Sequence, residues 1–163
     1  MADKAPDYEA DLAEARRRIV EEAEARTGFL DLTELDLPVV PEELFELTHL
    51  RRLHLGWKLE ETEDGEWRPA HFHGRWFVVE NIDSLARLTP ALEALSLFGT
   101  SGADISFLNR AINLRWLSVA VALVNDLTPL AGLDALQNLD CSETQVADLS
   151  PLAGLKALQT LDC

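Results

Sequence analysis

The sequence predicts an α/β solenoid, in which short parallel strands line a concave face and loops or 3₁₀ turns form the convex side. Three observations point to it. Strand leucines recur at a constant interval, at Leu95, Leu117, Leu139 and Leu161. Each follows another leucine by three positions and precedes an apolar residue by two, which gives the pattern L-x-x-L-x-L. A helical pattern at the start of the chain provides a cap for the first repeat.

The composition fits one repeat domain and excludes several classes of partner. The chain has 163 residues, enough for about six such units. Hydrophobic residues make up 47% of it, which is sufficient for a continuous core. The net charge of −15 repels phosphate backbones and anionic lipid, so we expect no nucleic-acid or membrane partner. The negative charge is compatible with a basic partner.

Residues 1–31 are predicted to form an N-terminal helical cap. Between about residues 7 and 26, apolar residues recur at helical spacing, at Leu12, Ala15, Ile19 and Ala23. Thr27-Gly28 then ends the helix, because glycine readily takes the left-handed conformation that closes one. The first repeat of a solenoid has no neighbour on one side, so its core needs such a lid. The alternative is a helix that binds a partner.

Residues 32–163 are predicted to form the repeat array. Its first strand is placed around Leu35, with Glu34 and Asp36 pointing outward, and its second around Leu53. The next leucine in register is Leu95, almost two repeats further on. Because the convex pattern resumes only after residue 81, residues 57–81 are interpreted as an insertion.

The insertion is rich in aromatic residues: Trp57, Trp67, Phe72, Trp76 and Phe77. Asp64-Gly65 between extended segments predicts a hairpin turn. The simplest interpretation is a small satellite core that fills the gap between repeats. The alternative is a partner-contact surface that includes Trp67 and Trp76, since tryptophan is enriched among the residues that dominate interface energy.

Two histidines in the insertion raise the question of a metal site. His71 and His73 would lie on the same side of a strand and could reach one metal ion, with acids at Glu61, Glu63 and Asp64 nearby. We favour the alternative of two exposed histidines in a surface hairpin, so no metal site is assigned. The sequence contains no phosphate-binding glycine loop, nucleophile elbow, C-x-x-C or H-E-x-x-H motif. We therefore predict no catalytic residue, no cofactor and no enzymatic activity.

The two cysteines of the chain indicate in which cellular compartment it resides. Cys141 and Cys163 occupy the same core position of successive repeats and are interpreted as small apolar core residues, with a bridge between them as the alternative. There is no other cysteine, and the N-terminus is charged where a secretory signal would be apolar. We therefore expect a reduced, cytoplasmic protein.

The concave face is the predicted binding surface. Outward strand positions alternate with the core leucines, and most of them are small or polar. Phe98 and Trp116 would be large exposed aromatics on neighbouring strands, and therefore candidates for partner contact. Polar specificity would come from Arg52, His54 and Arg115. The alternative is that Phe98 and Trp116 pack on the insertion.

The repeat unit x-V-x-D-L-S/T-P-L-A-G-L-x-A-L-x-x-L-D-C resembles the short leucine-rich repeats of bacterial proteins, including internalins and the repeats that precede the GTPase of Roco proteins. The resemblance covers about residues 28–163 and implies a right-handed superhelix. The sequence departs from the family where an asparagine ladder is replaced, at Thr100, Ala122 and Thr144.

The resemblance implies a non-catalytic module that binds a protein or peptide, within a larger bacterial signalling protein. One alternative is the regulatory repeat arm of a Roco-type GTPase whose catalytic domain lies outside this chain. Another is self-association, because the sequence reaches Cys163 inside a predicted strand without a capping repeat, and an open strand edge can pair with another copy.

Overall fold

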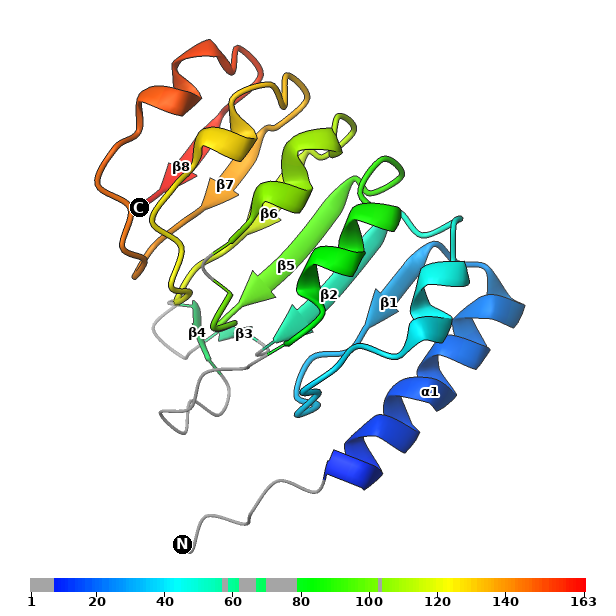
Figure 1. Cartoon of the computed structure of the whole chain (residues 1–163). Coiled ribbons are helices and arrows are strands. Elements are labelled where there is room, and N and C mark those ends of the chain that lie inside the picture. Colours follow the sequence, from blue (N-terminus) through cyan, green and yellow to red (C-terminus); the bar gives the residue numbers. More distant parts are fainter. Residues whose placement is uncertain (1–7, 57–58, 62–66, 70–78, 103) are drawn as a thin grey trace, which may run out of the picture.

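The computed structural model describes residues 8–56, 59–61, 67–69, 79–102 and 104–163. Within these residues, helix α1 (Tyr8–Ala25) precedes a parallel sheet of six short strands (Figure 1). In spatial order the strands are β1 (Phe29–Asp31), β2 (Arg52–Gly56), β5 (Ala94–Phe98), β6 (Trp116–Ser118), β7 (Asn138–Asp140) and β8 (Thr160–Asp162). The predicted α/β solenoid is confirmed.

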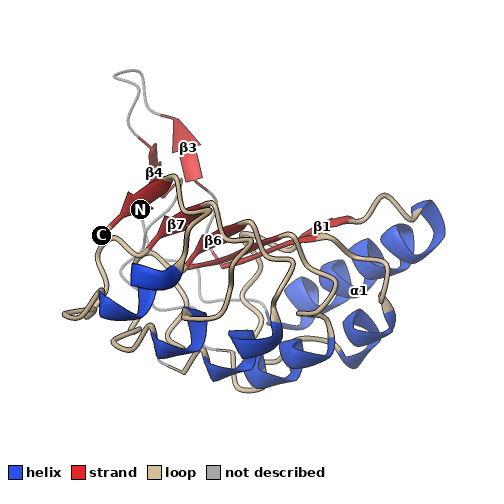
Figure 2. Ribbon diagram, turned by 90° about the horizontal axis from the view of Figure 1, so that it is seen from above, coloured by secondary structure: helices blue, strands red, loops and turns tan. Residues whose placement is uncertain are grey.

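Short 3₁₀ helices form the second layer of the molecule. They are η1 (Glu42–Glu46), η2 (Ile82–Arg87), η3 (Ser106–Arg110), η4 (Thr128–Leu130) and η5 (Ser150–Gly154). Figure 2 shows the strands on one side and these helices on the other. Because a short 3₁₀ helix takes up less of the chain than a full α-helix, each regular repeat can be short. The face of the sheet turned away from the 3₁₀ helices is called the open face below.

The leucine register explains both the regular repeats and one wrong prediction. Leu95, Leu117, Leu139 and Leu161 pair in register on four successive strands, as predicted. At the other end, Leu53 pairs with Leu30 of β1 and not with Leu35. The first repeat therefore runs from Leu30 to Leu53 and is about as long as the regular repeats.

The predicted first strand was misplaced because the leucines continue beyond it. Leu35 and Leu37 are buried, so burial alone does not separate them from strand leucines. The strand pairing ends near Glu34, whose positive φ of 67° turns the backbone away from the sheet. Phe29 and Asp31, and not Glu34 and Asp36, are consequently the outward residues of the first strand.

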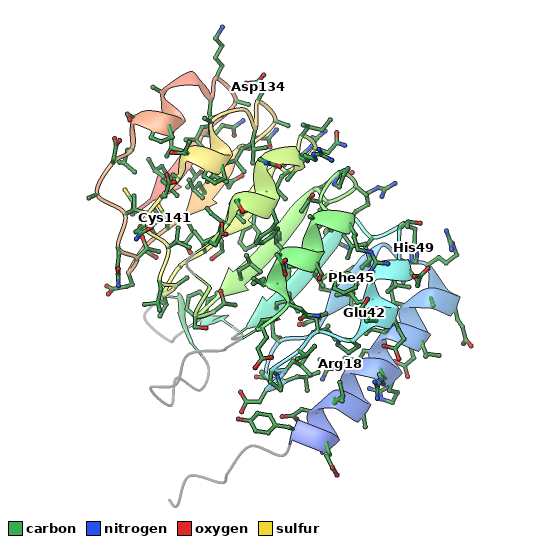
Figure 3. All side chains as sticks on the ribbon, in the orientation of Figure 1. Arg18, Glu42, Phe45, His49, Asp134 and Cys141 are labelled. Atoms are coloured by element: carbon green, nitrogen blue, oxygen red, sulfur yellow. The ribbon has the colours of Figure 1, made fainter. Side chains whose placement is uncertain are left out.

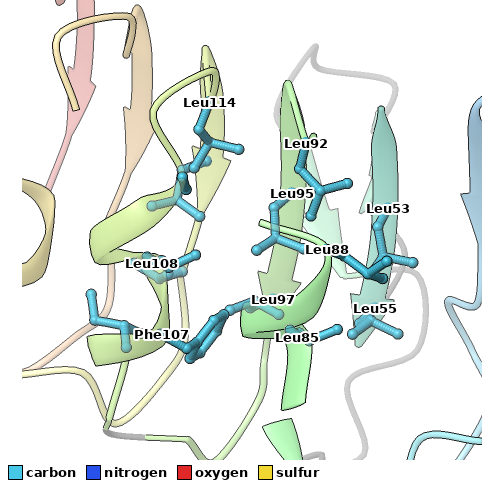
Figure 4. Packing of buried hydrophobic residues seen from close by; sticks show 14 of the residues in the cluster. Leu53, Leu55, Leu85, Leu88, Leu92, Leu95, Leu97, Phe107, Leu108 and Leu114 are labelled. Carbon is cyan, nitrogen blue, oxygen red and sulfur yellow. The ribbon is translucent and has the colours of Figure 1, made fainter. Parts of the chain in front are cut away.

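The core is a stack of leucines between the two layers. Strand residues Leu53, Leu55, Leu95 and Leu97 face the 3₁₀-helix residues Leu85 and Leu108 and the adjoining Leu88 (Figure 4). All of them are fully or almost fully buried. The same arrangement repeats from one unit to the next, so each unit contributes a slice of one continuous core.

Helix α1 packs against β1 and η1 at the start of the array (Figure 1). Ala15 and Ile19 are buried as predicted, whereas Ala23 is exposed and Glu22 takes the buried position in that turn. The Arg18 guanidinium also donates to the Asp31 carbonyl at 2.9 Å. The helix is thereby joined to the first strand by both apolar and polar contacts.

The buried Glu22 carboxylate connects the end of α1 to the next two segments. It accepts hydrogen bonds from the Thr27 hydroxyl at 2.6 Å and the Gly28 amide at 2.7 Å, and lies 2.9 Å from the His49 ring nitrogen. Burial alone would raise the pKa of Glu22, but these hydrogen bonds lower it below its ordinary value. Gly28, which was predicted to end the helix, has a φ of +77°. Glycine adopts this left-handed conformation without the steric cost that a side chain would impose.

Part of the insertion is described. Strands β3 (Leu59–Glu61) and β4 (Trp67–Pro69) pair antiparallel, with Glu61 opposite Trp67, which confirms the predicted hairpin. Figures 1 and 2 place the hairpin at the carboxyl ends of the sheet strands, on the open-face side. The predicted turn at Asp64-Gly65 and the histidines at 71 and 73 lie outside the described residues.

The chain re-enters the array through a side-chain clamp. The Asn81 amide accepts from the Val40 N–H at 2.9 Å and donates to the Val40 carbonyl at 3.0 Å. The Glu80 N–H also donates to the Pro38 carbonyl at 2.9 Å. These bonds hold the segment before η1 against the segment before η2.

The two cysteines differ in their surroundings, and both are free. Cys141 is buried as predicted, and burial, together with the neighbouring Cys163 thiol, raises its pKa to about 11. Cys163 is exposed, which contradicts the prediction of a core position. It follows β8, which is paired with β7 on one side only.

Candidate partner-binding surface on the open face

Two rows of outward side chains cross the open face. Because side chains alternate along a strand, they lie on either side of the central leucines. The first row is Phe29, Arg52, Ala94, Trp116, Asn138 and Thr160. The second row is Asp31, His54, Ser96, Ser118, Asp140 and Asp162.

Four of these residues form a continuous cluster, which we call the ring strip: Phe29, Arg52, His54 and Trp116. The His54 ring meets the Phe29 ring edge to face, with centroids 5.2 Å apart and planes at 78°. On its other side it approaches Trp116, with centroids 6.0 Å apart. The Arg52 guanidinium lies over the Phe29 ring, 4.8 Å from its centroid, within the range of a cation–π contact.

The ring strip extends over four strands because the intervening strand carries small residues. β5 lies between β2 and β6 and presents Ala94 and Ser96 at the two outward positions. Strands that are two apart are separated by about 10 Å, so larger side chains on β5 would keep the His54 and Trp116 rings from meeting. Phe29, His54 and Trp116 are half-buried and Arg52 is exposed, which leaves ring edges accessible to a partner.

The electrostatics of the ring strip favour a neutral His54. Burial lowers the pKa of His54 below its ordinary value of 6.5, and the Arg52 charge lowers it further. The Asp31 carboxylate acts in the opposite direction but does not cancel these effects. The ring strip therefore presents one permanent cation, Arg52, beside uncharged rings at neutral pH.

Carboxylates occupy the second row on both sides of the ring strip. Asp31 accepts from the Thr33 N–H at 2.9 Å and from its hydroxyl at 2.6 Å. Asp140 makes the same pair of bonds with Ser142, at 3.1 and 2.6 Å. These local bonds fix the orientation of both carboxylates and leave acceptor capacity on the open face.

The structure brings together three of the predicted contact residues, Arg52, His54 and Trp116. Arg115 is exposed and lies directly before the first residue of β6, an interior strand of the sheet. Trp67 lies in β4, where its backbone is described, and Trp76 lies outside the described residues. Whether any of these residues contacts a partner stays a prediction.

The prediction that Phe98 is an exposed aromatic is wrong. Its exposed fraction is 4%, although it does not belong to the leucine core. It pairs with Gly56, and the Ala120 carbonyl on its other side accepts from the Gly99 N–H. The neighbouring positions on both sides thus carry little or no side chain. Whether Phe98 packs on the insertion, the alternative offered by the sequence, stays a prediction.

The sequence prediction does not include Phe29 and Asp31, because it places the first strand too late in the chain. A signal for them exists in the sequence: Phe29-Leu-Asp-Leu has the same alternation as Arg52-Leu-His-Leu, one repeat later. Aligning these two segments gives the observed register and identifies both outward residues.

Two further observations concern other classes of site. In the part of the chain that the structure describes, no group of three or more His, Cys, Asp or Glu residues is arranged to hold a metal ion. Among these residues no helix combines the length and the apolar character needed to cross a bilayer.

The short parallel strands, the 3₁₀ helices behind them and the leucine register define the leucine-rich-repeat fold. Solved bacterial structures share it. Internalin C2 of Listeria monocytogenes superposes with a TM-score of 0.61 at 23% identity, over 93% of this chain and 72% of that one. A leucine-rich-repeat protein of Leptospira interrogans gives 0.63 at 18% identity, over 98% of this chain and 35% of that one. No protein-family model and no curated relative matches the sequence.

These likenesses confirm the predicted resemblance to bacterial leucine-rich-repeat proteins at the level of the fold. The chain spans about a third of the length of the Leptospira protein, 35%. What the open face does in this chain is therefore argued below from its own residues.

Proposed function

We propose that the chain is a non-catalytic recognition module that binds a protein or peptide on its open face, centred on the ring strip. The observation that carries the proposal is the chain of ring contacts from Phe29 through His54 to Trp116. Because side chains alternate along a strand, these rings lie on the side of the sheet that the leucine core does not use. They are held in place by one another and are still half-exposed.

The chemistry of the ring strip suits a protein partner. Tryptophan and arginine are enriched among the residues that dominate interface energy, and Trp116 and Arg52 lie on the same face. The rings are fixed by mutual contact, so little conformational freedom is lost when a partner covers them. The carboxylates of Asp31 and Asp140 flank the strip and offer acceptors to polar or basic groups of the partner.

The proposal also covers the larger protein and the cellular compartment to which the module belongs. We place it in a larger bacterial signalling protein, in the cytoplasm. The free thiols of Cys141 and Cys163 support a reducing compartment. The net charge of −15 supports solubility and attraction of a basic partner.

The test uses peptides selected from a random display library on the immobilised wild-type chain. Their affinities are then measured by fluorescence polarisation for the wild type, Trp116→Ala and Phe29→Ala. We expect binding to weaken about tenfold or more, as for truncation of an interface anchor. Ile112→Ala is the matched control, because Ile112 is 63% exposed and lies outside the ring strip.

Circular dichroism would verify that every variant keeps its fold. Peptides that bind Trp116→Ala and Phe29→Ala as tightly as the wild type would contradict the proposal. So would an equal loss of affinity in Ile112→Ala.

A further inference from the structure

A groove of about 470 Å³ lies between α1 and the segment before η1, and shares no residue with the ring strip. Its apolar lining includes Leu12 from the helix and Val39, Val40 and Pro41 from the segment. Tyr8, the first residue of α1, also lines the groove and is 51% exposed. This volume falls in the range of about 300–1,000 Å³ that is typical of ligand pockets.

Both walls of the groove are fixed by hydrogen bonds. On the helix side, the Asp11 carboxylate accepts from the Asp36 N–H at 3.1 Å. On the other side, the Asn81 clamp binds the N–H and carbonyl of Val40, and the Pro38 carbonyl accepts from Glu80. The groove is therefore present before any ligand arrives, which lowers the entropic cost of binding.

The rim of the groove is acidic. Glu9, Glu42 and Glu43 line it, against one arginine, Arg16. Figure 3 shows Glu42 on η1, beside α1. Glu43 lies 3.3 Å from Arg16, and Glu42 lies 3.1 Å from Arg87, in exposed ion pairs. Exposed pairs of this kind contribute little to stability, so a cation from a partner can replace either arginine at little cost.

We propose that this groove binds a short peptide segment that places a large apolar side chain between Leu12 and Val39 and a lysine or arginine beside it. The apolar walls account for the anchor side chain, and the three rim carboxylates account for the flanking cation. Val39 is 43% exposed although its neighbour Val40 is fully buried, so an apolar wall is already presented to solvent. An acidic or uncharged polar segment would gain neither contact.

The test uses three synthetic tetrapeptide amides, Lys-Leu-Trp-Lys, Glu-Leu-Trp-Glu and Lys-Ser-Ser-Lys, added to the ¹⁵N-labelled chain. We expect Lys-Leu-Trp-Lys to shift amide signals in the first turns of α1 and at Val39 and Val40. The other two peptides should bind at least tenfold more weakly, since one has the wrong charge and the other has no anchor.

Val39→Lys places a cation in the mouth of the groove and should abolish these shifts. Val20→Lys is the matched control, because Val20 is an exposed valine of α1 that does not line the groove, and it should bind like the wild type. Undiminished binding to Val39→Lys, or equal affinity for the acidic peptide, would overturn the proposal. The same shifts appearing on concentration, without peptide, would show that a second copy of the chain occupies the groove and would also overturn it.

Discussion

His54 and Trp116 bring their ring centroids to within 6.0 Å although their strands, β2 and β6, are separated by β5. The contact passes over Ala94 and Ser96, which are small enough to leave the space open. Phe29 meets the opposite side of the same imidazole. One histidine thus connects the first repeat to the fourth strand of the sheet.

This relationship predicts the titration of His54. Burial, assisted by the Arg52 charge, should hold the pKa of His54 below 6.5, against the smaller opposing effect of Asp31. Trp116→Ala uncovers one side of the ring, and the pKa should move back toward 6.5. The measurement is an NMR titration of the imidazole signals, with Ile112→Ala as the control. A wild-type pKa at or above 6.5, or an unchanged pKa in Trp116→Ala, would show that the rings do not pack as described.

Glu22 should be worth more to stability than any exposed acid of α1. Glu22→Ala leaves the amide of Gly28 and the hydroxyl of Thr27 without their acceptor. We expect a loss of about 1–3 kcal/mol in the free energy of unfolding, measured by urea denaturation. Glu24→Ala, an exposed substitution in the same helix, should change the free energy by less than about 0.5 kcal/mol.

The same carboxylate predicts the direction of a pH effect. The folded-state pKa of Glu22 lies below its ordinary value of 4.5. At any pH between these two pKa values, the unfolded state therefore binds more protons than the folded state. The stabilisation is complete above pH 4.5 and is lost as the pH falls through the folded-state pKa. The difference in stability between the wild type and Glu22→Ala should therefore shrink on acidification. If this difference in stability grew on acidification, the pKa of Glu22 would be raised in the folded state and not lowered.

Gly56 should tolerate no side chain. Its φ is +88°, and a Cβ atom at this position would lie 2.0 Å from the Phe98 carbonyl oxygen on β5. Gly56→Ala should reduce the free energy of unfolding by more than about 1 kcal/mol, because the backbone cannot adapt without separating two strands. Gly132→Ala is the control, since a Cβ there meets nothing within 4 Å. Equal stability of the two variants would contradict the pairing of β2 with β5.

Leu139 tests the repeat architecture. It is buried between Leu117 and Leu161, its partners on the two neighbouring strands. Leu139→Ala should cost about 2–5 kcal/mol, and hydrogen exchange should accelerate in β6 to β8 and not in α1, since each unit contacts only its neighbours. Leu161→Ala should reduce the free energy of unfolding by less than Leu139→Ala, because Leu161 is 40% exposed. Exchange that rises uniformly along the chain would contradict a repeat-by-repeat core.

The regular part of the fold could be predicted because one physical requirement repeats. A leucine that faces the 3₁₀-helix layer must recur at every strand, so the spacing of Leu95, Leu117, Leu139 and Leu161 determines the register. Where other leucines are buried for other reasons, as Leu35 is after β1, the same signal misleads.

The candidate site was harder to predict because it depends on neighbours in space. Trp116 and His54 were identified as outward residues, but their contact depends on the small size of Ala94 on the strand between them. Glu22 looks like one of many solvent-facing acids in the sequence, and only the folded chain shows the donors that surround it.

The most direct test of the proposed function is an NMR footprint of a library-selected peptide on the ¹⁵N-labelled chain. The account predicts that the largest amide shifts fall in β1, β2 and β6, together with the Trp116 indole signal, while η3 to η5 change little. Shifts confined to the 3₁₀ helices, with the strands and the Trp116 indole unchanged, would contradict it. Shifts confined to α1 and Val39–Val40 would assign binding to the groove and would equally contradict a role for the ring strip.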